Sequence, residues 1–493
     1  MRRLTVALIV LGAAALAAAA EAGPVVIPAD PSAGKPLPST WAEYFGVHYG
    51  RADRYDGPWF RTVRGYGGPH VGLAAGDDAG RGVGQPERKG PFTGRPVRLA
   101  LSDIRRPRGS ARDGMDGLID ELISHDLTGI YVFTSIVRPS TEPFDKDLAY
   151  WAARLMLERR PKAADHVLLQ LGNEINGLHF DPEGIGRRIA QTGESRWKYF
   201  NRTEKVAQYV EGYLAPAVEA IRRAARDVCG DERRATILSG SVANIYNPAS
   251  VRWLRSLMDC RIEGKQARSL AGTEVWKHVD ILTVHYPFGS ARGEAVMQEI
   301  HDAYLKTGKV EGVWVTEDHG ASGKGPATVV TRAMRFLAYA ASNGLNARQA
   351  RLVWWGVGRP KPGGRGIETV NRLGRFLSGG PLRWSRHRLG DAEATVLVRL
   401  GGDGAADRIL LAVVPDDGKT VAPGAIAIEA GDGAAPRQWL ARAVQFSAER
   451  PPTDHNVSAT LENGRVTVPV DGPIDGPWVL FVEADGAQDR KDG

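Results

Sequence analysis

Eight short apolar runs recur along most of the chain, separated by stretches with the spacing of amphipathic helices. The runs lie at 44–48, 97–101, 129–133, 166–171, 236–239, 281–284, 313–316 and 352–355. Most of them are continuously apolar, which is typical of parallel strands that are buried on both faces. In the longest intervening stretch, Val206, Tyr209, Val210 and Tyr213 fall at helical spacing. The alternation therefore predicts an α/β fold built on a parallel sheet.

Eight strand–helix units favour a closed (β/α)8 TIM barrel, with the barrel domain at 23–380. A Gly-rich insertion at about 50–94 would lie near the C-terminal end of the first strand. A doubly wound open sheet is the alternative, but nucleotide-binding sheets of that kind carry a GxGxxG turn or a P-loop there. Neither motif follows the run at 44–48, so the barrel is preferred.

The sequence pattern changes near Gly379-Gly380-Pro381. Beyond this point come only short β-type runs, separated by Asp-Gly and Asn-Gly pairs that mark turns. We expect a C-terminal β-sandwich at 381–486, followed by a tail at 487–493. The segment PVVIP at 24–28 could add a strand to this sandwich.

The first 22 residues have the parts of a secretory signal peptide. Arg2 and Arg3 precede an apolar stretch from Leu4, and Ala20-Glu21-Ala22 supplies a small-x-small cleavage site. An uncleaved membrane anchor is the alternative, but the stretch is mostly alanine and ends at that cleavage site. No later segment is long and apolar enough to cross a bilayer. We therefore expect an exported protein, periplasmic or extracellular, without stable membrane insertion.

The chain contains two cysteines, Cys229 and Cys260. Disulfides form in exported proteins, and an even number of cysteines allows all of them to pair. We therefore predict a possible disulfide between Cys229 and Cys260, with two free thiols as the alternative.

The formal net charge is +7, but the basic residues are interleaved with acidic ones along the helical stretches. No basic block with interleaved aromatic residues is present, so we expect no nucleic-acid partner, while an acidic substrate stays possible. The histidines lack a metal-ligand spacing such as HxxxH, and no cofactor motif is present. We expect a monomer that uses neither a metal nor a cofactor.

Polar and aromatic residues stand at or near the ends of several predicted strands. Because the active sites of (β/α)8 barrels lie at the C-terminal ends of the strands, these residues are candidates for one site. They are Asn173 and Glu174 after the fourth run, His285 and Tyr286 after the sixth, Glu317 after the seventh, Trp354 and Trp355 in the eighth, and Arg98 in the second.

Two carboxyl groups that face each other across a cavity lined by aromatic rings are what cleavage of a glycosidic bond requires. One carboxylic acid protonates the leaving oxygen, while the other, as a carboxylate, attacks the anomeric carbon or activates water. A single glutamate at a strand end is more often structural. The occurrence of Glu174 after the fourth strand and Glu317 after the seventh favours a catalytic pair.

With these motifs the sequence resembles glycoside hydrolase clan A, the retaining (β/α)8-barrel glycosidases. The matching residues are LGNE at 171–174, TVHYP at 283–287, VWVTE at 313–317 and VWWG at 353–356. The resemblance spans about 44–377, and the β-sandwich after the barrel is similar to the layout of family 39 and its relatives. It implies a retaining glycosidase with a carbohydrate substrate.

The resemblance also implies roles for the candidate residues. Glu174 would be the general acid/base, for which it needs a raised pKa, and Glu317 would be the nucleophile. Asn173 would hold the sugar 2-hydroxyl. Arg98 and Tyr286 would keep Glu317 ionised, since a nearby cation and a hydrogen-bond donor both favour the charged form.

Two further candidates have both a functional and a structural interpretation. His285 could contact the substrate or could be a hydrogen-bonded core histidine. Trp354 and Trp355 could stack on sugar rings, but neighbouring strand residues point to opposite faces, so only one of them can face the barrel interior. The other would pack under a helix.

The sequence therefore predicts a secreted retaining glycoside hydrolase that cleaves a polysaccharide or an oligosaccharide by double displacement. Two alternatives stay open. One is a non-catalytic polysaccharide-binding protein on the same fold, which does not need both glutamates. The other is an inverting hydrolase, which needs about 6.5–9.5 Å between the two carboxyl groups rather than about 5–5.5 Å.

Overall fold

The computed structural model describes residues 25–28, 34–48, 59–66, 87–99, 115–133, 144–159, 167–177, 201–318, 325–355 and 366–402, and most of 404–484. The predicted signal peptide at 1–22 and the predicted tail at 487–493 lie outside these residues. The chain forms two compact units. One contains Ala42–His319 and Ala347–Pro360, and the other contains Met1–Trp41, Gly320–Asn346 and Lys361–Gly493.

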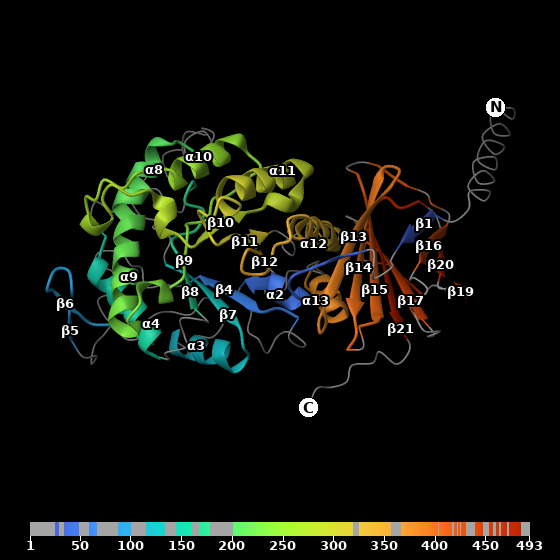
Figure 1. The fold of residues 1–493 in the computed structure, drawn as a ribbon, viewed down its shortest axis with the longest axis horizontal. Helices are drawn as coiled ribbons and strands as arrows, with labels where there is room; N and C mark the ends of the chain where they lie inside the picture. The colour runs from blue at the N-terminus through green and yellow to red at the C-terminus, as the bar shows by residue number, and fades with distance from the viewer. Residues whose placement is uncertain are drawn as a thin grey trace, which may run out of the picture. The chain divides into compact units, whose positions relative to one another are not determined.

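A closed barrel of eight parallel strands forms the centre of the first unit (Figure 1). In order round the barrel the strands are β3 (Phe45–His48), β4 (Thr62–Tyr66), β7 (Thr128–Val132), β8 (Val167–Gln170), β9 (Ile237–Leu238), β10 (Ile281–His285), β11 (Gly312–Asp318) and β12 (Ala350–Trp354). The last strand pairs with the first, which closes the barrel. The predicted (β/α)8 barrel is confirmed.

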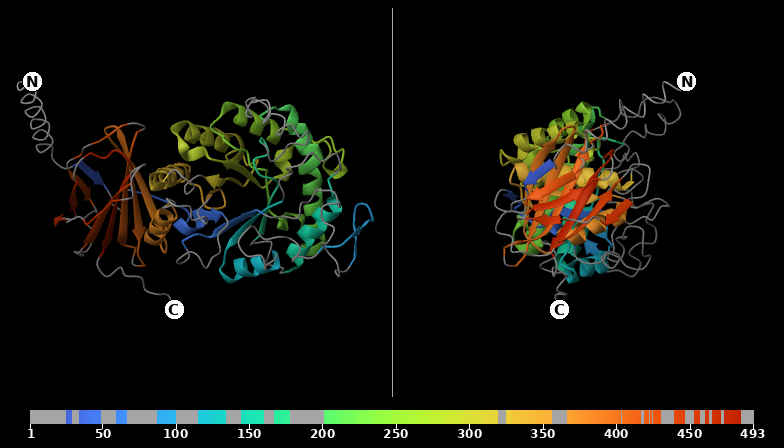
Figure 2. Two further views of the ribbon diagram at one scale, coloured as in Figure 1. Left: turned by 180° about the vertical axis from the view of Figure 1, so that it is seen from behind. Right: turned by 90° about the vertical axis from the view of Figure 1, so that its right-hand side faces the viewer.

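Helices lie around the outside of these strands (Figure 2). They are α3 (Met115–Ser124), α4 (Lys146–Arg159), α8 (Glu204–Tyr209), the π-helical turn η3 (Val210–Leu214), α9 (Ala215–Cys229), α10 (Pro248–Met258), α11 (Ala291–Ile300) and the π-helical turn η8 (His301–Leu305). In α9 the buried face includes Val218, Ile221 and Ala225. This helix ends at Gly230, whose φ of 74° suits a residue without a side chain.

The sequence predicts the second strand at 97–101, and this prediction is wrong. The strand between β3 and β7 is β4, TVRGY at 62–66. Within the predicted run, Pro96–Val97 (β6) instead pairs with Arg88–Lys89 (β5) in a separate two-stranded sheet. β4 does not show an apolar run because it carries Arg64, which is fully buried. The apolar run at 97–101 therefore has the sequence pattern of a buried strand, whereas the actual strand, β4, does not.

The barrel interior changes from apolar to polar along the strands. An apolar cluster takes one residue from each of six consecutive strands: Ile130, Leu168, Leu238, Ile281, Trp314 and Val353. Two residues further along three of these strands, and therefore on the same face, stand Gln170, Thr283 and Thr316. The amide nitrogen of Gln170 lies 3.4 Å from the hydroxyl of Thr283 and 3.5 Å from that of Thr316. A polar layer therefore lies above the apolar floor, towards the C-terminal ends of the strands.

Two sheets form a β-sandwich in the second unit. The larger sheet has the order β18 (Thr453–Asn456), β17 (Trp439–Gln445), β21 (Trp478–Ala484), β15 (Ala406–Pro415), β14 (Ala392–Leu400), β13 (Leu382–Leu389) and β2 (Lys35–Pro36). The smaller has the order β1 (Val25–Pro28), β16 (Ala425–Glu429), β20 (Arg465–Pro469) and β19 (Thr460–Glu462). Val396, Leu411, Ile426 and Val466 are among the buried side chains of their common core. Helices α12 (Gly325–Ser342) and α13 (Gly366–Leu377) belong to the same unit.

The N-terminal strands belong with the C-terminal sheets, whereas the sequence assigns 23–380 to the barrel. β1 lies in the segment PVVIP and pairs in parallel with β16, and β2 pairs with β13. Ile27 of β1 is fully buried in the sandwich core. Burial of this apolar side chain explains why the segment joins the sandwich.

The predicted disulfide is not formed, because Cys229 and Cys260 are both free thiols. Cys229 is the last residue of α9, while Cys260 follows α10 and has its sulfur 3.8 Å from the carbonyl oxygen of Arg261. The two cysteines therefore lie at the C-terminal ends of different helices, α9 and α10. Burial, with Glu211 and Glu263 nearby, raises the pKa of the Cys260 thiol, so this thiol is poorly reactive.

Among the described helices, none combines the length and the apolar character needed to cross a membrane.

Candidate active site

Asn173 and Glu174 follow β8 on a backbone that turns sharply. Gly172 has a φ of 98° and Glu174 a φ of 45°. For a residue with a side chain this left-handed conformation costs about 1–3 kcal/mol and persists only where the surroundings enforce it. Ser241, on the segment after β9, supplies the contacts: its Oγ accepts a hydrogen bond from the Glu174 N–H at 3.1 Å, and its carbonyl accepts one from the Ile175 N–H at 3.0 Å. The backbone of Glu174 is therefore held firmly in an unusual conformation.

Glu317 lies near the end of β11, paired with a buried arginine. Its Oε1 accepts a hydrogen bond from Nη1 of Arg64 at 2.6 Å, and the two side chains are 3% and 0% exposed. The Arg64 guanidinium also donates to Gln170 at 2.8 Å and to Oδ1 of Asn173 at 2.7 Å. A guanidinium so close to a buried carboxylate favours the charged form of that carboxylate. Arg64 thus links β4, β8 and β11 and places a positive charge where it favours the ionised form of Glu317.

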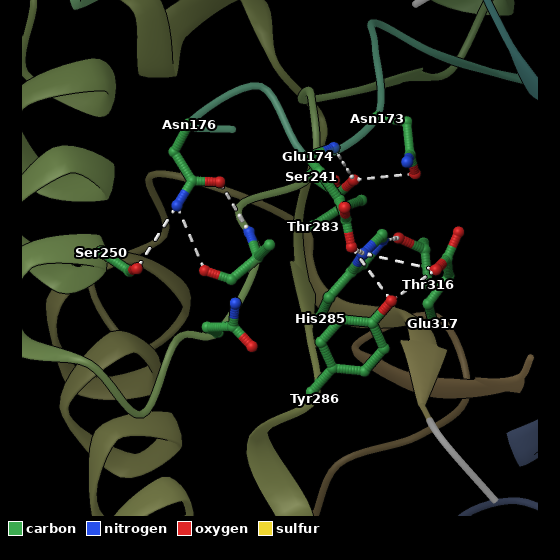
Figure 3. A network of polar contacts seen from close by, with 12 residues as sticks. Asn173, Glu174, Asn176, Ser241, Ser250, Thr283, His285, Tyr286, Thr316 and Glu317 are labelled. Atoms are coloured by element: carbon green, nitrogen blue, oxygen red, sulfur yellow. Dashed lines mark hydrogen bonds and ion pairs between the residues drawn. The ribbon is translucent and has the colours of Figure 1, made fainter. Parts of the chain in front are cut away.

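Tyr286 lies between the two glutamates (Figure 3). Its hydroxyl is 3.0 Å from Oε1 of Glu174 and 2.8 Å from Oε2 of Glu317. Like Glu174, Tyr286 has a left-handed backbone, with a φ of 62°. Burial, followed by the nearby charges of Glu317 and Glu174, raises the pKa of Tyr286 well above its ordinary value. The phenol therefore keeps its proton and acts as a hydrogen-bond donor at this position.

His285 is fully buried and contacts both carboxyl groups. Its Nδ1 is 3.3 Å from Oε1 of Glu174 and 3.7 Å from Oε2 of Glu317. Its other ring nitrogen, Nε2, lies 3.1 Å from the hydroxyl of Thr316. His285 is therefore a buried, hydrogen-bonded histidine beside the two carboxyl groups, and its contact with a substrate stays a prediction.

The two carboxyl groups are close together but differently exposed. The side chain of Glu174 is 24% exposed, against 3% for Glu317. One oxygen of each glutamate and one ring nitrogen of His285 all lie within 4.8 Å of one another. Glu174 faces solvent and is therefore suited to exchange protons with a ligand. Glu317 is buried beside Arg64 and is therefore suited to stay ionised.

These three side chains could each offer one ligand atom to a metal ion. The Arg64 guanidinium, 2.6 Å from Glu317, would repel a cation bound there. The phenol of Tyr286 also already bridges the two carboxyl groups. The arrangement favours proton transfer over metal binding.

The prediction for Arg98 is wrong. Arg98 lies beyond the short strand β6, its side chain is 59% exposed, and it pairs with Glu87 at 2.9 Å. The arginine that holds Glu317 is Arg64, which the sequence analysis missed. The short β-type stretch TVRGY at 62–66, inside the Gly-rich insertion predicted at about 50–94, is the signal that could have identified it.

The two tryptophans of the eighth run lie in different environments. Trp354 is completely buried and stacks on Phe45 at 6.0 Å between ring centroids. Its neighbour Val353 belongs to the apolar cluster inside the barrel, so Trp354 faces outward. The predicted substrate contact of Trp354 is therefore wrong. Trp355 is half-buried just beyond the strand, and its backbone N–H donates to the carbonyl of Asp318 at 2.9 Å.

No family model and no curated protein matches the chain. Among solved structures, it is similar to a glucosidase from Croceicoccus marinus, with 10% identity over 93% of this chain and 99% of that one and a TM-score of 0.47. A family 51 α-L-arabinofuranosidase from Bifidobacterium longum has 11% identity, the same coverage and a TM-score of 0.47. A family 39 glycoside hydrolase from Bacteroides cellulosilyticus has 13% identity over 90% of this chain and 82% of that one, with a TM-score of 0.46.

Proposed function

We propose that this chain is a retaining glycoside hydrolase that cleaves a polysaccharide or an oligosaccharide. The observation that supports this most directly is the tyrosine-bridged pair of carboxyl groups, one solvent-facing and one buried against Arg64. Glu317 would attack the anomeric carbon and form a covalent glycosyl intermediate. Glu174 would protonate the leaving oxygen and then, as a base, activate the water that releases the sugar.

The hydrogen bonds around Tyr286 support this division of roles. A phenol has one proton, so Tyr286 can donate to only one of the two carboxyl groups at a time. If Glu174 is protonated, it donates to the phenol oxygen, and the phenol proton is left for Glu317. The same proton placement is needed at the start of the reaction, with an acid at Glu174 and a carboxylate at Glu317.

Asn173 is placed to bind a sugar hydroxyl. Its Oδ1 accepts from Arg64 at 2.7 Å and lies 3.4 Å from the hydroxyl of Ser241, which fixes the orientation of the amide. The amide nitrogen is then the group that can donate to a ligand. A contact of this kind with the 2-hydroxyl strengthens as the transition state forms.

The spacing favours this mechanism over inversion. One carboxyl oxygen of Glu174 lies within 4.8 Å of one carboxyl oxygen of Glu317. An inverting enzyme holds a water molecule between carboxyl groups about 6.5–9.5 Å apart, and this spacing leaves no room for it. A purely binding protein is also disfavoured, because burying the Arg64–Glu317 pair costs desolvation energy that sugar binding alone does not require.

The substrate we propose is a polysaccharide handled outside the cytoplasm, as the predicted signal peptide at 1–22 implies. Screening the purified protein against a panel of polysaccharides and aryl glycosides tests this proposal. Hydrolysis of at least one member is expected. Binding to a polysaccharide without hydrolysis of any member would favour the non-catalytic alternative.

Glu174→Ala should affect substrates according to their leaving groups. Hydrolysis of a natural glycoside should fall by about 10²–10⁴-fold, because its alkoxide leaves slowly without a proton. Dinitrophenolate is a good leaving group that needs no proton. The first step with a dinitrophenyl glycoside, measured as a burst of dinitrophenol, should therefore be largely preserved. The second step should be slow until added azide, which needs no base, attacks the intermediate.

Glu174→Gln is the matched variant, since it keeps the size and polarity of the side chain but cannot give up a proton. Equal losses on both substrates for the two variants, without rescue by azide, would assign Glu174 a structural role.

A further inference from the structure

Tyr246 is an exposed aromatic residue on the segment that joins β9 to α10. Among the described residues, three large hydrophobic ones stand out as exposed: Val26, Tyr246 and Leu440, at 41%, 42% and 66%. Of these, only Tyr246 belongs to the barrel unit. It follows the C-terminal end of a barrel strand, where ligands of such barrels bind. An exposed ring at this position is therefore available to a ligand.

The segment that carries Tyr246 is tied to the candidate site by several hydrogen bonds. Ser241 holds the backbone of Glu174, as described above. The side chain of Asn176 binds both polar groups of the Ala243 backbone, accepting from its N–H at 2.8 Å and donating to its carbonyl at 3.2 Å. Ile245 donates its N–H to the carbonyl of His285 at 3.5 Å. The position of Tyr246 is thus coupled to Glu174 and His285 through a continuous set of contacts.

The ring of Tyr246 is itself restrained. Its hydroxyl donates to Oδ1 of Asn244 at 3.0 Å. Asn244 has a φ of 51°, and it is one of four non-glycine residues with positive φ in the described part of the chain. Two of the other three are Glu174 and Tyr286. A ring held in place before a ligand arrives loses little conformational entropy on binding.

The location also indicates which part of a substrate would meet this ring. In the proposed mechanism the sugar that is attacked lies between the two glutamates, and the leaving group lies beside Glu174, which protonates its oxygen. In the view of Figure 3, Asn176 and Glu317 lie on opposite sides of Glu174. Asn176 holds the Ala243 backbone, so the segment that continues to Tyr246 starts on the side of Glu174 away from the nucleophile.

We infer that Tyr246 forms a stacking platform for the leaving-group sugar, binding the apolar face of a pyranose ring next to Glu174. This inference rests on the proposed function and extends it: the protein would act on substrates with a sugar on both sides of the cleaved bond. The apolar face of a sugar covers an aromatic ring much as another ring does, so the contact should contribute to affinity.

The test compares two substrates that share the same glycone, the sugar that the wild type hydrolyses in the panel screen. One is its trisaccharide, which has a leaving-group sugar, and the other is its glycosyl fluoride, which has none. Tyr246→Ala should lower kcat/KM for the trisaccharide about 3- to 10-fold, mainly through KM. It should leave hydrolysis of the glycosyl fluoride unchanged. Tyr246→Phe keeps the ring but loses the hydrogen bond to Asn244, so it should lose less than Tyr246→Ala on the trisaccharide and should match the wild type on the fluoride.

Leu440→Ala, at an exposed apolar residue of the other unit, is the control and should change neither substrate. Unchanged kcat/KM of Tyr246→Ala on the trisaccharide would overturn the inference while leaving the proposed function intact. Equal losses on trisaccharide and fluoride would also overturn it, because they indicate a structural effect on Glu174. If the wild type hydrolyses no member of the panel, the proposed function itself fails, and the inference fails with it.

Discussion

Replacing Glu317 by Ala should lower turnover by about 10⁴-fold or more on every glycoside that the wild type hydrolyses. In the proposed mechanism Glu317 forms the bond to the anomeric carbon, and no leaving group compensates for a missing nucleophile. Azide should restore turnover of an activated aryl glycoside by attacking in place of the carboxylate. Because a single displacement then occurs, the glycosyl azide should have the anomeric configuration opposite to that of the substrate. The azide product of Glu174→Ala, formed by two displacements, should keep the substrate's configuration.

The buried partner of Glu317 makes a control for folding necessary. Glu317→Ala leaves the Arg64 guanidinium buried without a counter-charge, which costs about 3–5 kcal/mol of stability. Glu317→Gln keeps an oxygen that can accept from Arg64, so it is the matched variant, and its Tm should lie closer to that of the wild type. Substantial turnover by folded Glu317→Gln would contradict the nucleophile role.

Arg64→Met should strongly destabilise the protein, although Arg64 does not react with the substrate. The side chain is 0% exposed and donates to Gln170, Asn173 and Glu317. Its removal leaves a buried carboxylate without a cation, so the free energy of unfolding should fall by about 3–5 kcal/mol. Without the cation the neutral form of Glu317 is favoured, so the pH–activity profile should move to higher pH. Urea denaturation and kcat/KM across pH measure the two effects.

Arg98→Met is the matched control for this prediction. Arg98 and Glu87 are 59% and 54% exposed, and a surface pair of this kind contributes about 0–1 kcal/mol. We therefore expect wild-type stability and an unchanged pH profile. Arg64→Lys should be intermediate, because it keeps the charge but cannot reproduce the three directed contacts of a guanidinium. If Arg64→Met and Arg98→Met had the same stability and the same pH–activity profile, Arg64 would not be the cation that keeps Glu317 ionised.

The two glutamates could be predicted from the sequence because each comes shortly after an apolar run of a recognisable type, at 166–171 and at 313–316. Alternation along the chain gave seven of the eight barrel strands to within a few residues, and strand ends meet at one face of a barrel. Glu174, His285, Tyr286 and Glu317 therefore had to lie close together once the strand order was known. Their contacts follow from the topology and not from any local motif.

Arg64 could not be predicted in the same way, because it breaks the pattern by which strands are identified. A charged residue within a barrel strand looks like a surface residue until its partners on β8 and β11 are known. The choice between Trp354 and Trp355 was open for a related reason. Alternation shows that the two point to opposite faces, but only the burial of Val353 inside the barrel shows which face each takes.

The most direct test of the central claim is the anomeric configuration of the first product. Proton NMR of the wild type acting on a glycoside identified in the screen, recorded before mutarotation, distinguishes the two stereochemical outcomes. A nucleophilic Glu317, with carboxyl oxygens of the pair within 4.8 Å, predicts that the first product keeps the configuration of the substrate. A first product of inverted configuration would contradict the account, because it requires a single displacement by water and leaves Glu317 without the role of nucleophile.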